Sequence, residues 1–381
     1  MIDLERLDAS LDLALSEEVR VHRSLATTPA PSYAASPEVA TPEAATPEAG
    51  TPPASVPRAP SPPRHRPSPQ PAGARSSPLA PADIVWQDLD IAQHAQAVVN
   101  LVSQGRLAEA DLHIAAHGDL AGATGRSTHR ADAVGWRVMR ALLDGREDAA
   151  RAGVEELNAL DPEGRDPESQ ERLWAQRLAV ALTWGSEDER FAVLDHCRRR
   201  AYTQGDVAWR GRLTVLLAVL GRTDEAARDF DATIASVTTG TGGEALLDVV
   251  TDLAEAAWVL GDTARSRLAG QRLARAVTAP VVVVGRAWVC KGSVDFYRAL
   301  TAVAAGHVDD ADRWFRSAAE AHRHLGADAL LARTLRGWAT SLTGRDPQRS
   351  VQLLRQGTEL AHRLGLVDEE PVARSVVAQA S

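Results

Sequence analysis

Regularly spaced glycines divide the chain beyond residue 83 into segments of similar length. Successive glycines are separated by 40, 40, 36, 40, 45 and 38 residues. The series consists of Gly105, Gly145, Gly185, Gly221, Gly261, Gly306 and Gly344. Each glycine ends an apolar segment of helical periodicity and precedes polar residues that favour a new helix, which is the asymmetry expected between two helices. The spacing therefore predicts repeated helical pairs, and such a period is typical of a stacked solenoid.

Within these segments, the residues five, nine and twelve places after a glycine tend to be small or apolar. After Gly306 they are Ala311, Phe315 and Ala318, and similar residues follow two other glycines of the series. The pattern resembles the second helix of a tetratricopeptide repeat (TPR), where a small residue lets two helices approach and a larger one fills the gap. The resemblance implies an all-α fold, a TPR-like α-solenoid of about seven helical hairpins over residues 83–381, with a period longer than the ~34 residues usual for that family. Val281–Val284 is the single strand-like run, and we expect it between helices.

The last part of the chain is similar to the helical-repeat region of large ATP-binding transcriptional regulators and nucleotide-cyclase-linked ATPases of high-GC bacteria. The segments that carry this resemblance are VVVVG (281–285), CKGSVD (290–295), YRAL (297–300), WFRSAAEA (314–321), HRHLGA (322–327) and ARTL (332–335). In that family the repeats follow an ATPase module and sometimes precede a DNA-binding helix-turn-helix. Neither module is recognisable in this sequence, so the resemblance implies a scaffold or sensory role without ATPase activity or direct transcription-factor activity.

The first 82 residues differ in composition from the rest. Sixteen of the 21 prolines lie between Pro29 and Pro81, and proline at this density removes backbone donors and prevents helix formation. Residues 26–82 are therefore expected to be a disordered, extended linker rich in Pro, Ala, Ser and Thr.

Residues 1–25 are expected to form an amphipathic helix. Leu4, Leu7, Leu11 and Leu15 recur at steps of three and four, which places them on one face. Such a helix is marginally stable alone, because most helical stability comes from packing of the apolar face. These leucines are therefore possible partner-binding residues, and the helix would dock either on its own repeats or in a groove of another protein.

Charge and cysteine content exclude several classes of protein. The net charge of −9 argues against direct binding of nucleic acid, which depends on basic residues. Two cysteines exclude a disulfide-rich secreted scaffold. The sequence has no apolar run of about 18 residues and begins with acidic residues, so we expect a cytoplasmic protein that does not contact a membrane.

No nucleotide site is expected. A phosphate-binding loop needs glycines followed by Lys and Ser or Thr. The most glycine-rich stretch, TTGTGGE at 238–244, ends in an acid. Lys291, the only lysine in the chain, follows Cys290 and no glycine loop. We therefore expect neither ATP nor any other cofactor.

No metal site is expected either. His113 and His117 have the i, i+4 spacing of metal ligands, but no His-Glu-x-x-His signature surrounds them, and a half-buried pair is favoured. His322 and His324 are two residues apart and would point to different faces of a helix.

Nucleophilic catalysis is not expected. His196 and Cys197 are adjacent, and adjacent helical residues diverge, so they cannot form a nucleophile–base pair directly. Cys197 is predicted to be a core thiol, and Cys290 a partly exposed one in an irregular segment.

Two further groups have structural interpretations. The basic run Arg198–Arg200 is expected at a solvated helix end, where the helix dipole favours positive charge. Six tryptophans are expected to pack on apolar helix faces, namely Trp136, Trp174, Trp209, Trp258, Trp288 and Trp338.

The sequence therefore favours a non-catalytic scaffold that binds a peptide or helix of another protein on the concave face of a TPR-like solenoid. The alternative is a ligand-sensing regulatory subunit that acts with a separate ATPase or DNA-binding regulator. An enzyme is the third possibility. An open, continuous groove would favour the scaffold, and a clustered polar pocket with perturbed carboxylates would favour an enzyme.

Overall fold

The computed structural model describes residues 81–239 and 244–366. All described residues belong to one compact unit within Leu79–Ser381. The N-terminal helix with Leu4, Leu7, Leu11 and Leu15, residues 26–80 of the predicted linker and the glycine-rich stretch at 240–243 lie outside the described residues. Residues 81 and 82, which were predicted to belong to the linker over 26–82, instead begin the first described helix.

The described residues form fourteen α-helices, one short π-helix and one two-stranded hairpin, so the predicted helical fold class is confirmed. None of these helices is long and apolar enough to cross a bilayer. In chain order the elements are α2 (Pro81–Ser103), α3 (Leu107–Thr124), α4 (Ser127–Asp144), α5 (Glu147–Leu160), α6 (Pro167–Thr183), α7 (Glu187–Arg198), η1 (Arg199–Thr203), α8 (Val207–Val219), α9 (Thr223–Thr239), α10 (Glu244–Leu260), α11 (Thr263–Ala276), β1 (Val281–Val284), β2 (Val289–Ser293), α12 (Val294–Ala304), α13 (Val308–His324), α14 (Asp328–Leu342) and α15 (Pro347–Arg363).

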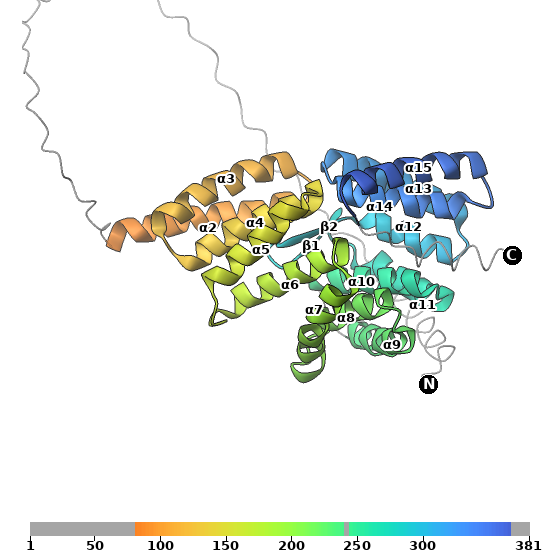
Figure 1. Cartoon of the computed structure of the whole chain (residues 1–381), viewed down its shortest axis with the longest axis horizontal. Helices are drawn as coiled ribbons and strands as arrows, with labels where there is room; N and C mark the ends of the chain where they lie inside the picture. The colour runs from red at the N-terminus through yellow and green to blue at the C-terminus, as the bar shows by residue number, and fades with distance from the viewer. Residues whose placement is uncertain (1–80, 240–243, 367–381) are drawn as a thin grey trace, which may run out of the picture. The chain divides into compact units, whose positions relative to one another are not determined.

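Consecutive helices pack as pairs, beginning with α2 and α3 and ending with α14 and α15 (Figure 1). The glycines of the sequence series lie in the turns inside these pairs, as predicted. Five of them adopt a positive φ, between 65° and 79°. Glycine reaches this left-handed conformation without the steric cost of a Cβ, so each can end one helix and reverse the chain.

Contacts also extend beyond neighbouring pairs. Helix α14 packs against α4, and the Trp184 indole N–H, at the end of α6, donates to the Leu364 carbonyl at 3.0 Å. A Cβ on Gly145 would lie 2.7 Å from the Leu364 side chain. The last pair of helices thus reaches the second and third pairs, whereas a regular open stack would confine contacts to successive units.

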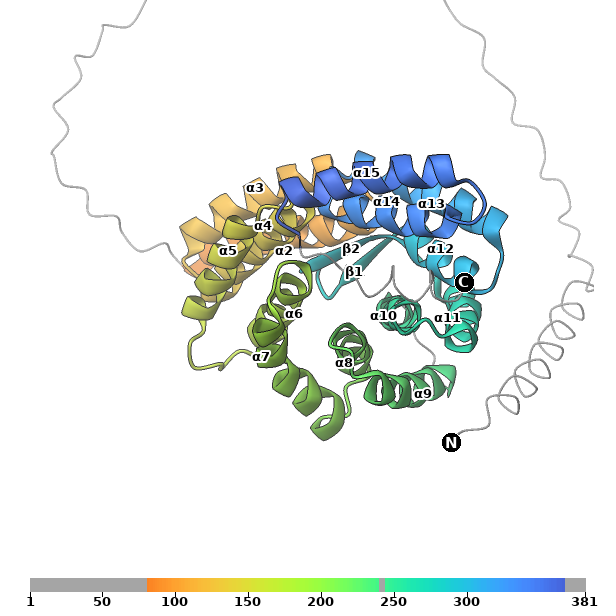
Figure 2. The same cartoon turned by 45° about the vertical axis from the view of Figure 1, so that its right-hand side comes forward.

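The predicted strand-like run is β1, which pairs antiparallel with β2. The hairpin lies among the helices and contacts α2, α4, α6, α10, α12 and α13 (Figure 2). Its turn is held by two side chains: the Trp136 indole N–H donates to the Arg286 carbonyl at 2.9 Å, and Gln176 Nε2 donates to the Trp288 carbonyl at 2.7 Å. The prediction that Trp288 lies on a helix face is therefore wrong, because this buried residue lies in the hairpin turn.

His322, on α13, connects the other end of the hairpin to α13 and α14 through hydrogen bonds. Its Nε2 accepts the backbone N–H of Ser293 at 2.9 Å, and its Nδ1 is 2.9 Å from Thr334 Oγ1. Because Thr334 Oγ1 donates to the Leu330 carbonyl, Nδ1 carries the proton of a neutral ring. A Cβ on Gly292 would lie 2.4 Å from Nε2, so the close approach requires glycine.

This arrangement predicts a loss of stability in acid. Burial, followed by the charge of Arg333, lowers the pKa of His322 to about 3. In the unfolded chain the imidazole of His322 is protonated below about pH 6.5, whereas in the folded chain it stays neutral down to about pH 3. The contribution of His322 to the free energy of unfolding is therefore complete above pH 6.5 and is lost as pH falls toward 3. Between these pH values the free energy of unfolding should fall by about 1.4 kcal/mol per pH unit. Urea unfolding between pH 7.5 and 4 should show a shallower pH dependence for His322→Gln than for the wild type. The exposed control His324→Gln should keep the wild-type slope, and equal slopes for all three proteins would contradict this assignment.

Candidate functional site

A cavity of about 250 Å³ lies on the inner side of the helical array. Its wall is formed mainly by the first helix of successive pairs, α4, α6, α8, α10, α12 and α14, together with the hairpin and α15. Most of the wall is apolar and includes Leu143, Leu178, Val215, Trp258 and Leu300. A concave apolar pocket with a few converging polar groups is the usual form of a small-molecule site.

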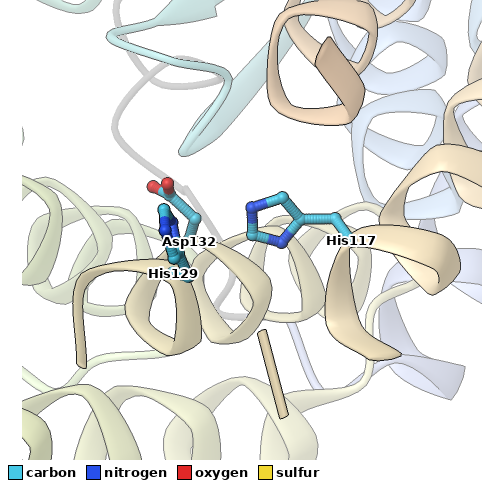
Figure 3. Close-up of side chains that lie close together, drawn as sticks. All are labelled: His117, His129 and Asp132. Carbon is cyan, nitrogen blue, oxygen red and sulfur yellow. The ribbon is translucent and has the colours of Figure 1, made fainter. Parts of the chain in front are cut away.

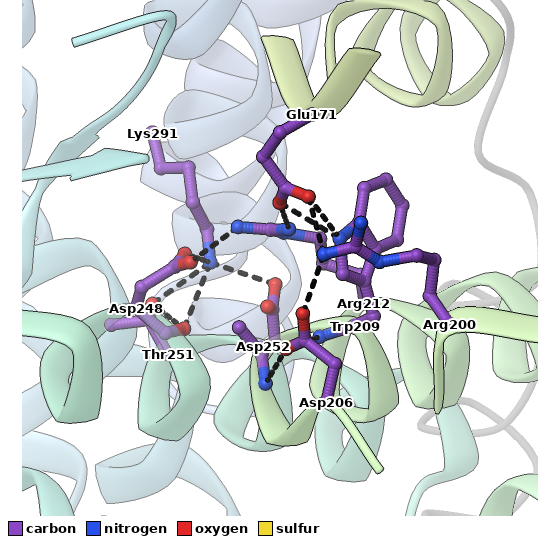
Figure 4. A network of polar contacts seen from close by, with 10 residues as sticks. Glu171, Arg200, Asp206, Trp209, Arg212, Asp248, Thr251, Asp252 and Lys291 are labelled. Atoms are coloured by element: carbon purple, nitrogen blue, oxygen red, sulfur yellow. Dashed lines mark hydrogen bonds and ion pairs between the residues drawn. The ribbon is translucent and has the colours of Figure 1, made fainter. Parts of the chain in front are cut away.

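Lys291 extends from β2 into this cavity and ends on α10 (Figure 4). Its Nζ donates to Asp252 Oδ1 at 2.7 Å, to Asp248 Oδ1 at 3.0 Å and to Thr251 Oγ1 at 2.9 Å. Burial lowers the pKa of Lys291, but attraction by Asp252 and Asp248 outweighs burial and holds this pKa above its ordinary value. The ammonium is therefore charged, buried and fully paired at neutral pH.

The same cluster continues into α8 and α6. Arg212 Nη2 lies 3.1 Å from Asp248 Oδ2, and Arg212 Nη1 lies 3.2 Å from Glu171 Oε1. Glu171 also accepts from the Trp209 indole N–H at 2.8 Å and pairs with Arg200 at 2.6 Å. These contacts link β2, α10, α8, α6 and η1 through alternating charges (Figure 4). A buried charge needs such partners, because an unpaired one is costly to remove from water.

Asp252 retains one free hydrogen-bonding position. Its Oδ1 accepts from Lys291, whereas its buried Oδ2 has no partner among the described residues. Gly211 on α8 packs closely beside it, since a Cβ there would already be in van der Waals contact with Oδ2 at 3.4 Å. Burial raises the pKa of Asp252 to about 7; Lys291 opposes this rise and Asp248 adds to it. Asp252, a residue of the cavity wall, thus keeps one buried acceptor without a partner among the described residues, and its pKa is raised.

A second ion pair lies in the same wall. Glu255 on α10 and Arg333 on α14 approach to 2.6 Å, and the Arg333 guanidinium lies over the Phe296 ring at 5.0 Å. Tyr297 donates its hydroxyl to the Lys291 carbonyl at 3.2 Å. Most charged groups of the site are thus already paired within the protein.

The cysteines are not nucleophiles in this arrangement. Cys290 lines the cavity and is buried, so the prediction of partial exposure is wrong: β2 lies inside the helical array and not on its surface. Burial raises the pKa of Cys290 to about 11 and that of Cys197 to about 12. Cys197 is 1% exposed and belongs to the core, as predicted. A thiol is nucleophilic as the thiolate, which neither residue forms near neutral pH.

The histidines predicted as a pair are separated in the structure. His113 Nδ1 lies 2.8 Å from His94 Nδ1, while His117 is buried beside Trp136 and His129. The expected half-buried pair of His113 and His117 is therefore wrong, because the two rings face different neighbouring helices.

The other residues singled out from the sequence stack on or pair with neighbouring side chains. His196 stacks on Trp174 with ring centroids 4.0 Å apart. In the basic run, Arg198 pairs with Glu225 at 2.9 Å, and Arg200 pairs with Glu171.

Asp248 and Asp252 were not identified from the sequence. They lie four residues apart on α10, EALLDVVTDLAEAAWVL, so they share one face of a strongly apolar helix. Acids at i and i+4 inside such an apolar helix, in a chain with a single lysine, were the signal that could have indicated a buried ion pair. The partner could not be assigned from spacing alone, because Lys291 lies 39 residues beyond Asp252.

No protein-family model matches the chain, and no curated protein matches it significantly. The resemblances to tetratricopeptide repeats and to the ATP-binding regulators remain predictions from the sequence.

Removal of the lysine charge should destabilise the protein strongly. In Lys291→Met, Asp248 and Asp252 face each other with only Arg212 to compensate, and loss of one partner of a buried ion pair costs about 3–5 kcal/mol. The double variant with Asp252→Asn should recover part of this loss, because it removes the carboxylate left unpaired. Urea unfolding at pH 7.5 measures both effects.

A matched control is available on the surface. Arg345 pairs with Asp309, and their side chains are 55% and 86% exposed. Arg345→Met should cost no more than about 1 kcal/mol. A Lys291→Met variant as stable as this control, or a double variant less stable than Lys291→Met, would contradict the role assigned to the ion pair.

Proposed function

We propose that the protein is a non-catalytic ligand sensor whose helical array, TPR-like in organisation, encloses one small molecule in the inner cavity. The ligand has an apolar body and a hydroxyl or amino group that donates a hydrogen bond to Asp252. The observation that carries this proposal is the buried, unpartnered Oδ2 of Asp252 in a largely apolar wall. A buried acceptor without a donor is costly, and a ligand that supplies the donor recovers that cost on binding.

The size of the cavity is close to that of a small-molecule site. The cavity holds about 250 Å³, near the lower end of small-molecule pockets. A compact molecule or one inserted side chain fits this volume.

The chemistry of the wall favours binding over catalysis. The pocket has the clustered polar groups and the raised carboxylate pKa that would also suit an enzyme. However, Lys291 is held as a paired ammonium and Cys290 as a thiol. These two groups therefore serve to shape and charge the wall.

A regulatory role follows from the resemblance to ATP-binding regulators. We propose that ligand binding in the cytoplasm changes how the array contacts a separate ATPase or DNA-binding regulator. A ligand shifts such an equilibrium only through differential affinity for the two states. Here the difference would arise at α10, whose acids contact both the ligand and the hairpin.

A second candidate is the protein-binding scaffold. Leu354 of α15 lines the cavity and is 47% exposed, so an apolar side chain from outside can reach its entrance. A partner peptide or helix would insert one leucine there. The stripe Leu4, Leu7, Leu11 and Leu15 is one candidate occupant, proposed from the sequence alone.

The sensor proposal predicts a specificity that one substitution reverses. At pH 8, where Asp252 is ionised, a panel of equally sized phenylalkyl compounds should bind with the alcohol and amine ahead of the ketone and methyl ether by about tenfold or more. In Asp252→Asn the amide oxygen must face Lys291, so the NH2 group takes the place of Oδ2 and the preference should reverse. Calorimetric titration of each compound measures the order.

The same calorimetric titration includes a control variant and tests the scaffold candidate. Asp309→Asn, on the surface, should keep the wild-type order. An order unchanged by Asp252→Asn would contradict the sensor proposal. Displacement of the bound alcohol by a peptide of residues 1–20, but not by the same peptide with Leu7→Asp and Leu11→Asp, would support the scaffold instead.

A further inference from the structure

A second group of polar side chains lies outside the cavity, between α3 and α4. His117 comes from α3, and His129 and Asp132 come from α4 (Figure 3). One ligand atom from each residue lies within 4.8 Å of the others. We propose that these three residues bind a divalent transition-metal ion of the zinc type. This inference is independent of the ligand proposed for the cavity.

His117 provides the strongest argument for a bound ion. Its side chain is completely buried, and neither ring nitrogen has a hydrogen-bond partner among the described residues. The Trp136 ring meets it edge to face at 4.8 Å and offers no acceptor. Buried polar atoms are nearly always satisfied, so a doubly unpartnered imidazole needs an explanation. A metal ion bound to one nitrogen provides it, since neutral imidazole is a common metal ligand.

The ligand set matches this class of metal. His129 and Asp132 are three residues apart on α4, so both lie on the helix face that meets α3. Two imidazoles and a carboxylate form a ligand set found for zinc and ferrous ions, and three protein ligands leave a position for water. Ligand atoms on one zinc ion are roughly 3–3.5 Å apart, so small side-chain rotations would close the site.

Asp132 is already oriented by its surroundings. Arg172 donates to its Oδ1 at 2.7 Å, and Arg286 lies 3.9 Å from its Oδ2. Glu168 pairs with Arg286 at 3.3 Å and lies 3.9 Å from Arg172. Two carboxylates thus balance the two arginines, and Arg172 holds the ligating carboxylate as an outer-shell partner.

The neighbouring histidines provide an internal control. His94 and His113 contact each other through their Nδ1 atoms at 2.8 Å and do not belong to the cluster of His117. His113 is close in sequence and lies on the same helix, so its replacement tests whether any histidine of α3 would serve.

The full chain, freed of metal with a chelator, should bind one equivalent of Zn²⁺ in calorimetric titration. Co²⁺ should give the intense visible absorption of a four-coordinate ion. Loss of an outer-shell partner alone costs about 10–100-fold in affinity, so His117→Leu and His129→Ala should each weaken Zn²⁺ binding by at least about 100-fold. His113→Ala should bind as the wild type does.

Circular dichroism identifies any variant that fails to fold, and the partly buried His129 allows a substitution that leaves the core intact. No saturable binding of Zn²⁺ or Co²⁺ by the wild type would overturn the proposal. Equal loss of binding in His113→Ala would also overturn it, because the ion would then lie at another histidine pair. Wild-type affinity for Zn²⁺ in a folded His129→Ala variant would likewise overturn the proposal.

Discussion

Burial of the single lysine between two carboxylates of α10 is the interaction on which the inner side of this protein depends. Lys291, Asp248 and Asp252 lie where water is largely excluded, so each charge is tolerable only while the others are in place. The pairing joins the hairpin to α10, and Arg212 extends it to α8 and, through Glu171, to α6. The positions of four elements are thereby coupled to one electrostatic arrangement.

The hairpin explains how a helical array can have an interior that distant helix pairs share. Its turn accepts hydrogen bonds from Trp136 and Gln176, and its far end donates to His322, so helices of distant pairs contact it. It thus supplies non-local contacts between units that would otherwise meet only their neighbours. The cavity lies beside this hairpin, and its polar wall is the part of the interior where charges replace apolar contacts.

Local features were predictable from the sequence, and long-range ones were not. Five of the seven turn glycines and the strand-like run have local causes, namely left-handed φ and β-branched side chains, and both features appear in the structure. The partners of Lys291 and the separation of His113 from His117 depend on how helices are rotated against one another. That rotation is fixed by packing over the whole array. The error over Cys290 has the same origin, because an irregular segment was assigned to the surface although its hairpin fills the interior.

Selective ¹⁵N-lysine labelling tests the central claim most directly, because Lys291 alone gives a side-chain Nζ signal. Attraction by Asp252 and Asp248 holds the pKa of Lys291 above its ordinary value. The account predicts an ammonium signal with slow proton exchange at neutral pH that remains protonated beyond about pH 10.5, the ordinary value. A signal that titrates at or below about pH 10.5, with the rapid exchange of a solvated amine, would show that the ion cluster does not form and would contradict the account.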